Sequence, residues 1–118
     1  MSRQIVNADS IIGVEVRNTQ GEKLGKVEAL MLDKLDGHVS YVVLSFGGFL
    51  GMGDKLFAMP WSMFSYDNKN DCFTIAIDKE KLKNSPGFDK DHWPDMSSPA
   101  WGTSLHRYYG ITPQRAQH

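Results

Sequence analysis

The apolar residues of this chain come in short runs with a two-residue period, and residues that favour turns separate the runs. Residues 11–18, IIGVEVRN, alternate Ile12, Val14 and Val16 with small or charged residues. A two-residue period is that of a strand with one buried face, since successive side chains point to opposite faces. The sequence NTQG then ends this run in a turn at Gly21. The pattern therefore predicts a protein built mainly of short β-strands.

Residues 23–34, KLGKVEALMLDK, fit two interpretations, because their apolar residues match either one face of a helix or one face of a strand. The next residues favour the strand. Asp36-Gly37 offers a hairpin turn that leads directly into residues 38–46, HVSYVVLSF. This second run is rich in Val and aromatic residues and is apolar on both faces, as expected of a central strand.

Three further runs complete the strand pattern. Residues 55–61, KLFAMPW, end near Pro60, which lacks an N–H and so marks a sheet edge or a strand end. The runs 63–66 and 72–77 are joined by the polar loop DNKND. Turns recur roughly every 6–12 residues, which favours a small antiparallel β-barrel of five or six strands, closed or half-open. Closure of the barrel would remove the exposed strand edges.

From residue 79 the pattern changes to short helices. KEKLKN is a helical turn that stops at Ser85-Pro86-Gly87, and a second helix is expected between the N-cap Ser98 and the stop at Gly110. The second helix carries an aromatic stripe with the spacing of one helix face. We therefore divide the chain into a barrel, 1–78, and a C-terminal extension, 79–118. The stripe consists of Trp101, Leu105, Tyr108 and Tyr109.

Composition excludes several classes of function. The 13 Lys and Arg residues are balanced by 14 Asp and Glu, and no basic stripe is evident, so direct binding of nucleic acid is not expected. No apolar run reaches the roughly 18–20 residues of a transmembrane helix, and the first ten residues have no secretory pattern. Cys72 is the single cysteine, which excludes an intrachain disulfide. Residence in the cytoplasm is the expectation that remains.

Residues 11–64 resemble the PRC-barrel family. The resemblance rests on a pattern Gly-x-x-Leu-Gly-x-Val formed by Gly21, Leu24, Gly25 and Val27, a hydrophobic third strand, a Gly-rich loop and the strand end Met59-Pro60-Trp61. The family includes the cytoplasmic barrel of the photosynthetic reaction-centre H subunit and the C-terminal domain of a ribosome-maturation factor. The resemblance implies a small barrel that binds other macromolecules, and it leaves the partner and the pathway open.

One stretch, GFDKDHWPDM at residues 87–96, could carry chemistry. Asp89, Asp91, His92 and Asp95 are possible ligands of a hard or mixed metal ion, which makes a metal-dependent enzyme or metal sensor the alternative function. The spacing matches neither an EF-hand loop nor a zinc-protease helix. The favoured interpretation is a loop whose aspartates cap backbone N–H groups and whose Trp93 packs on the barrel. We expect no enzyme activity and no cofactor.

Two apolar features favour an interaction surface. The connection GGFLGMGD, residues 47–54, carries large apolar side chains that either fold onto the core or form a patch for a partner. The helical stripe packs either on its own barrel or on a second subunit. We predict a non-enzymatic interaction or scaffold module, a homodimer that binds a protein or ribonucleoprotein partner. The predicted interface residues are Phe49, Leu50, Met52, Trp93, Trp101, Leu105, Tyr108 and Tyr109.

Overall fold

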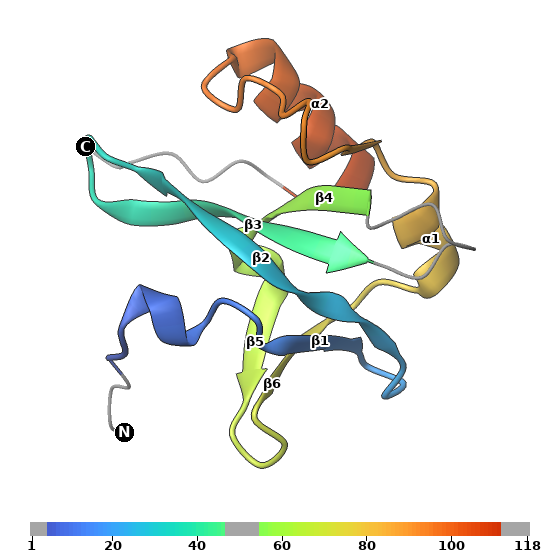
Figure 1. Cartoon of the computed structure of the whole chain (residues 1–118). Helices are drawn as coiled ribbons and strands as arrows, with labels where there is room; N and C mark the ends of the chain where they lie inside the picture. The colour runs from blue at the N-terminus through green and yellow to red at the C-terminus, as the bar shows by residue number, and fades with distance from the viewer. Residues whose placement is uncertain (1–4, 47–54, 112–118) are drawn as a thin grey trace.

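The computed structural model describes residues 5–46 and 55–111. These residues form one sheet of seven strands in the order β5-β6-β1-β2-β3-β4-β7, with helices at its ends and on one side (Figure 1). The elements are η1 (Ala8–Ser10), β1 (Glu15–Asn18), β2 (Lys23–Asp33), β3 (His38–Phe46), β4 (Lys55–Pro60), η2 (Trp61–Met63), β5 (Phe64–Asp67), β6 (Cys72–Ile75), α1 (Lys79–Lys83), β7 (Gly87–Phe88) and α2 (Pro99–Tyr109).

The strand interpretation of residues 23–34 is confirmed, because β2 pairs with β3 from Lys26 to Asp33 in an antiparallel hairpin. Gly37 in the connecting turn has φ of 81°, a left-handed conformation that glycine adopts without strain. The register of the hairpin shifts between Val27 and Ala29 and again between Met31 and Leu32. Such irregularities bend a strand and increase its twist, so β2 can belong to a strongly curved sheet.

Gly25 is required by a close approach between β2 and β3. Its φ is 152°, and a Cβ atom placed there would lie 2.1 Å from the backbone oxygen of Ser45. Real Cβ atoms do not approach a carbonyl oxygen so closely, so any other residue would force the two strands apart. Glycine at this position of the family pattern thus permits the close approach of β2 and β3.

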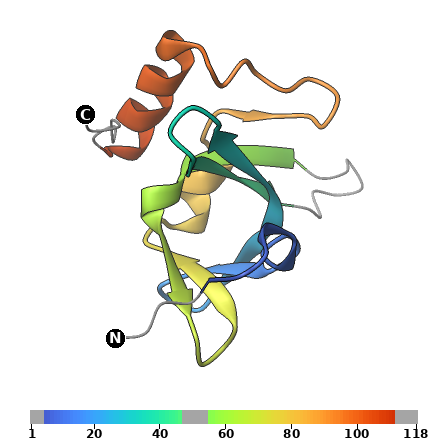
Figure 2. The same ribbon diagram turned by 90° about the vertical axis from the view of Figure 1, so that its left-hand side faces the viewer.

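The sheet differs from the expected antiparallel barrel of five or six strands. It has seven strands in the described residues, and β1 pairs in parallel with β6, so the sheet is mixed. Its end strands, β5 and β7, do not pair with each other, and the sheet is not closed. It nevertheless curls strongly, so that its strands outline a barrel when viewed end-on (Figure 2). The direction of β1 against β6 was not predictable from local patterns, because those strands are far apart in sequence.

The C-terminal extension contributes to the same sheet and core. After α1, residues Gly87 and Phe88 form β7 and pair with Leu56 and Phe57 of β4. Leu82 of α1 is fully buried with the core of the sheet. The strand system therefore continues past residue 78, where the sequence pattern suggests the end of the barrel.

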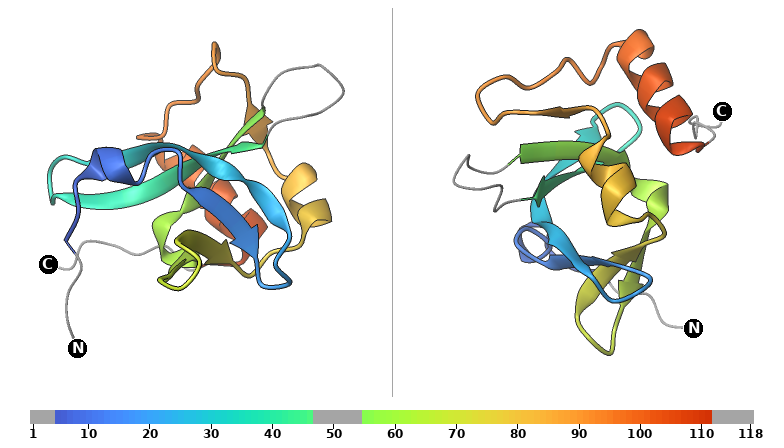
Figure 3. Two further views of the ribbon diagram at one scale, coloured as in Figure 1. Left: turned by 60° about the horizontal axis from the view of Figure 1, so that its bottom comes forward. Right: turned by 90° about the vertical axis from the view of Figure 1, so that its right-hand side faces the viewer.

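Helix α2 begins and ends where the sequence predicts. The Ser98 hydroxyl accepts a hydrogen bond from the backbone N–H of Trp101, Pro99 lies in the first turn, and Gly110 ends the helix with φ of 69°. The helix lies across one side of the sheet (Figure 3). The Tyr108 hydroxyl donates to the backbone oxygen of Lys81, 2.8 Å away, which ties α2 to α1. In the part of the chain described, no helix is long and apolar enough to span a membrane.

Candidate functional site

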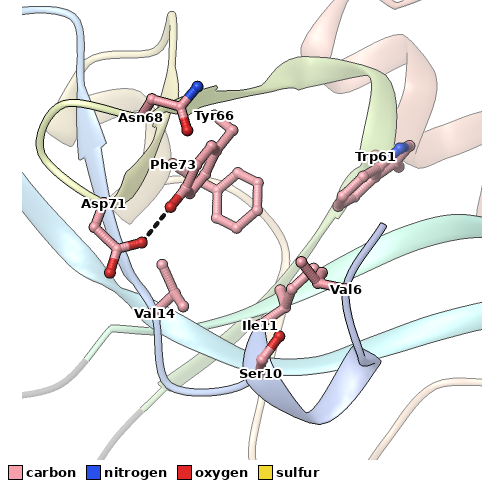
Figure 4. A pocket seen from close by; sticks show the side chains of 9 residues that line it. All are labelled: Val6, Ser10, Ile11, Val14, Trp61, Tyr66, Asn68, Asp71 and Phe73. Carbon is pink, nitrogen blue, oxygen red and sulfur yellow. Dashed lines mark hydrogen bonds between the residues drawn. The ribbon is translucent and has the colours of Figure 1, made fainter. Parts of the chain in front are cut away.

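A pocket lies between the N-terminal segment and the hairpin of β5 and β6 (Figure 4). It has a volume of about 650 Å³ and combines apolar and aromatic side chains with a few polar groups, three of which, on Tyr66, Asn68 and Asp71, lie in the hairpin of β5 and β6. Segments far apart in the sequence, 6–14 and 61–73, supply its walls. The residues that line it are Val6, Ser10, Ile11, Val14, Trp61, Tyr66, Asn68, Asp71 and Phe73.

Trp61 reaches this pocket because of the turn that follows β4. Pro60 has φ of −57° and ψ of 136°, and the chain then makes the single turn η2 before it enters β5. Proline supplies no N–H for continued strand pairing, so β4 ends here and the chain changes direction. Trp61 is left at the rim of the pocket with 37% of its surface exposed. An indole this exposed, at a pocket rim, is available to a partner.

Phe73 is the centre of the aromatic wall. Its ring centroid lies 5.3 Å from that of Tyr66, 6.0 Å from that of Trp61 and 6.1 Å from that of Phe64, and all three contacts are edge to face. This is the preferred geometry of aromatic pairs, in which the positive edge of one ring meets the negative face of another. Phe73 is buried, whereas Tyr66 keeps 44% of its surface exposed. The wall is therefore pre-formed and still accessible.

The hairpin turn between β5 and β6 supplies the polar end. The Tyr66 hydroxyl donates a hydrogen bond to Oδ1 of Asp71 (Figure 4). This bond to a carboxylate favours the neutral phenol and is the main reason that the pKa of Tyr66 is raised. Asp71 has φ of 51°, a left-handed conformation in which Asp and Asn are the most tolerated side chains after glycine.

The turn itself is held by Asp67. Its Oδ1 accepts hydrogen bonds from the backbone N–H groups of Lys69 and Asn70, at 3.0 and 3.2 Å. Its Oδ2 accepts from the side-chain amide of Asn70 at 2.8 Å. These bonds, the Asn70 side chain first, lower the pKa of Asp67. The position of Asp71 is thus fixed by an ordered turn.

The opposite wall comes from the N-terminal segment. The Asn7 side chain accepts a hydrogen bond from the backbone of Asp9 and caps η1. Backbone hydrogen bonds from Gly13 to Val27 and from Val27 to Val14, at 2.8 and 2.9 Å, attach the segment to β2. Gly13, with φ of 90°, interrupts the strand, so β1 starts at Glu15 and is shorter than the sequence predicts. Val14 and the residues before it are therefore available to line the pocket.

The lining of the pocket contains a single charged side chain. Asp71 is the one carboxylate among the nine lining residues, and no histidine, cysteine, lysine or arginine accompanies it there. Among the lining residues, the Tyr66 hydroxyl is the group that the structure places in a hydrogen bond with this carboxylate. A cavity that is mostly apolar, with a few polar groups and one charge, has the composition of a recognition site.

The loop with the possible metal ligands is highly exposed. His92 Nδ1 and Asp89 Oδ2 are 4.0 Å apart, and both side chains point mainly into solvent. Asp95 accepts a hydrogen bond from the backbone N–H of Ser97 at 3.0 Å, so it caps a turn, as the favoured interpretation predicts. Within residues 5–46 and 55–111, no three His, Cys, Asp or Glu side chains are grouped to hold a metal ion. The geometry gives the metal-site alternative no support.

Those predicted interface residues that the structure describes lie apart from this pocket. Phe49, Leu50 and Met52 fall outside the described residues. Leu105 and Tyr109 are buried in the protein's own core, and Trp101 and Tyr108 are half-buried against it. Of the two surfaces considered for the helical stripe, its own sheet is therefore the one that it covers. Trp93 packs on Phe88 of β7, with ring centroids 5.1 Å apart, and remains 41% exposed.

Sequence reasoning did not find Trp61 and Tyr66. In the sequence, Met59-Pro60-Trp61 indicates only a strand end within a family pattern, and no local signal places the Trp61 indole at the rim of a pocket. Tyr66 pairs with Phe73 in the register of the hairpin, and its hydroxyl donates to Asp71 at the end of the connecting turn. The sequence did not show that Val6 and Val14 line the same pocket as Trp61 and Tyr66, because that depends on the tertiary structure.

Comparison with known proteins agrees with this architecture. The family model for the PRC-barrel domain matches residues 4–82, which is more than half of the chain. No curated protein matches the sequence. The match spans every strand from β1 to β6 and most of the helix α1, and it includes all nine residues of the pocket. The chain belongs to the PRC-barrel domain family.

Proposed function

We propose that this protein is a non-enzymatic interaction module that binds another protein through the pocket beside β5. The observation that carries the proposal is the pair Trp61 and Tyr66, two partly exposed aromatic side chains held in place by the buried ring of Phe73. Aromatic side chains in such positions are typical anchors of protein interfaces. PRC-barrel domains generally act as protein-interaction modules, which supports the same conclusion.

A protein partner suits this surface better than a nucleic acid. Asp67 and Asp71 lie in the hairpin turn at one end of the pocket, and carboxylates repel the phosphate groups of a nucleic-acid backbone. The chain as a whole has a formal net charge of −1. If the partner is a ribonucleoprotein, this face contacts its protein component.

The position of β5 at the end of the sheet adds a second feature. β5 pairs with β6 on one side, and no strand of the described chain pairs with its other side. An edge strand can accept a further strand from a partner, since its outward backbone groups are available for ladder hydrogen bonds. The pocket beside it would then receive the partner's side chains.

Self-association into a homodimer, with residence in the cytoplasm, belongs to the same proposal. The hairpin of β2 and β3 carries two exposed leucines, Leu32 and Leu35, the latter 92% exposed. We expect a dimeric mass by light scattering at micromolar concentration, and a monomeric mass would refute this part. Replacing Phe49 and Leu50 with serine is expected to weaken the assembly if residues 47–54 contribute to it. Cell fractionation tests the location.

The main experiment compares two exposed tryptophans. The wild type, Trp61→Ala and Trp93→Ala are each used for cross-linking and affinity capture in native cells, followed by mass spectrometry. Trp93 is the matched control, because its exposure is similar and it lies away from the pocket. We expect a partner that the wild type and Trp93→Ala retain and that Trp61→Ala loses. Equal retention by both variants would refute the pocket as the binding site.

A further inference from the structure

We propose that the pocket beside β5 receives a lysine or arginine side chain of the partner protein. The inference rests on the proposed function, because it names the chemistry of the group that the module binds. It requires an apolar channel for the aliphatic stem of that side chain and a negative group for its cation. The pocket has both, at known positions.

The negative group is the carboxylate of Asp71. It is the one formally charged side chain in the lining, and in the described part of the chain no basic side chain lies within ion-pair distance of it. Tyr66 donates one hydrogen bond to Oδ1. A carboxylate has about four acceptor positions, so this single bond leaves room for further donors. Arg17, a cation of the neighbouring β1, already pairs with Glu15 at 2.6 Å.

The apolar channel leads from Asp71 towards Trp61. Figure 4 shows Asp71 and Trp61 at opposite ends of the pocket, with Phe73, Val14 and Ile11 between them. Lysine and arginine place an aliphatic stem along apolar surface and keep the charged head in a polar environment. Their cations are also attracted to the faces of Trp and Tyr rings. Both interactions are available here along one path.

Other occupants fit this lining less well. An acidic side chain would be repelled by the carboxylate of Asp71 and by that of Asp67, which lies at the start of the same turn. A purely apolar side chain would displace water from the Asp71 carboxylate without replacing its hydrogen bonds, which carries a desolvation penalty. A side chain with both an aliphatic body and a cation avoids both penalties. The charge of the pocket therefore selects among partners.

The test uses small probes of this chemistry with the whole chain. The probes are the Nα-acetyl methylamides of lysine, arginine, norleucine and glutamate, and the readout is the NMR signal of the Trp61 indole N–H, assigned with Trp61→Phe. We expect saturable shifts with lysine and arginine. Norleucine has the same stem without the cation, and we expect it to bind about fivefold more weakly, since an exposed ion pair contributes an effect of that order. Equal binding of lysine and norleucine would overturn the proposal, as would the absence of binding by lysine and arginine.

Asp71→Asn is the informative variant. Asparagine tolerates the left-handed backbone at this position and can still accept the hydrogen bond of Tyr66, so the change removes the charge and retains the turn. We expect the variant to bind lysine and norleucine equally, whereas the control Asp89→Asn, in an exposed loop, keeps the preference. A preference that persists in Asp71→Asn would overturn the inference.

These experiments distinguish a failure of the inference from a failure of the proposed function. If Trp61→Ala loses the cellular partner and Asp71→Asn retains it with undiminished affinity, the pocket binds a protein and the assigned cation is wrong. Suppose that the wild type is a dimer, that Asp71→Asn is a monomer, and that the variant still prefers the lysine probe to norleucine. A second copy of the chain then occupies the pocket, and the inference is also overturned. Loss of both the partner and the lysine preference supports it.

Discussion

Trp101 of α2 meets Tyr41 of β3 edge to face, with ring centroids 5.1 Å apart and ring planes at 78°. One turn further along α2, Leu105 is 2% exposed and belongs to the core of the sheet. The helix is therefore part of the folded unit. Because a truncated core leucine leaves a cavity, we expect Leu105→Ala to lower the free energy of unfolding by about 2–4 kcal/mol.

Urea denaturation measures this loss, and two of the tryptophans allow a graded comparison. Trp101→Ala is expected to cost about 2 kcal/mol, because the ring is half-buried and loses its contact with Tyr41. Trp93→Ala, at the exposed surface, should cost less than about 1 kcal/mol. Unchanged stability of Leu105→Ala, together with a loss of dimer mass, would return α2 to the role of a subunit interface.

Gly25 offers a second test of the architecture. Alanine at this position would place Cβ 2.1 Å from the Ser45 oxygen, at a φ of 152°. Since backbone atoms of both strands would have to move, we expect Gly25→Ala to destabilise the fold by more than about 3 kcal/mol. Gly37→Ala is the matched control, because Gly37 also has positive φ, yet beyond its chain neighbours no atom lies within 4 Å of the position that an added methyl group would take. It should cost about 1–2 kcal/mol. Thermal or urea unfolding compares the two, and equal losses would contradict the close approach of β2 and β3.

Tyr109 predicts how stability depends on pH in the alkaline range. Burial raises its pKa from 10.0 to about 12, so the folded protein keeps the phenol neutral where the unfolded chain would ionise it. The unfolded state therefore binds fewer protons between these values, and stability falls as pH rises from 10 to 12. The expected slope is up to about 1.4 kcal/mol per pH unit, and below pH 10 the contribution is constant.

Two phenylalanine variants isolate this effect. Tyr109→Phe should flatten the loss of stability above pH 10, as measured by urea midpoints at several pH values. Tyr108→Phe removes the neighbouring hydroxyl, whose bond is to the Lys81 backbone, and should keep the slope of the wild type. An unchanged slope in Tyr109→Phe would show that other groups control alkaline unfolding.

The exposed loop after β7 is expected to bind no divalent cation. Asp89 and His92 lie 4.0 Å apart at the surface, and the Asp95 side chain is engaged in capping the turn at Ser97. Millimolar Mg²⁺, Ca²⁺, Mn²⁺ or Zn²⁺ should therefore leave the melting temperature unchanged in differential scanning fluorimetry. An increase that disappears in His92→Ala but persists in His38→Ala would revive the metal-site alternative.

Much of the secondary structure was predictable, because it depends on residues that are close together in the sequence. The turn at Asp36-Gly37 and the strands on either side of it follow from residues within a few positions of one another. The same holds for α2, whose ends at Ser98 and Gly110 are fixed by a side-chain cap and a left-handed glycine. Membership of the family was also predictable from the sequence, through the spacing of Gly21 and Gly25.

The candidate site was not predictable to the same degree. The sequence did not decide which of two surfaces the aromatic stripe of α2 packs on, since periodicity identifies a buried face but not what covers it. Phe49 and Leu50 were prominent as apolar residues in a glycine-rich connection, whereas Trp61 and Tyr66 were hidden among ordinary strand residues. Large apolar side chains near strand ends are common, so their presence in the sequence does not show where a pocket lies.

The sequence by itself determined most of the strands, the turns between them and both ends of α2, because these features depend on backbone preferences and on neighbours a few residues away. Only the tertiary structure decided that β6 lies parallel to β1, that α2 covers its own sheet, and that Val6, Trp61 and Asp71 share one pocket. These relationships join segments distant in the chain. Their free energy comes from surfaces that meet only when the sheet curls, and no local pattern records which surfaces those are.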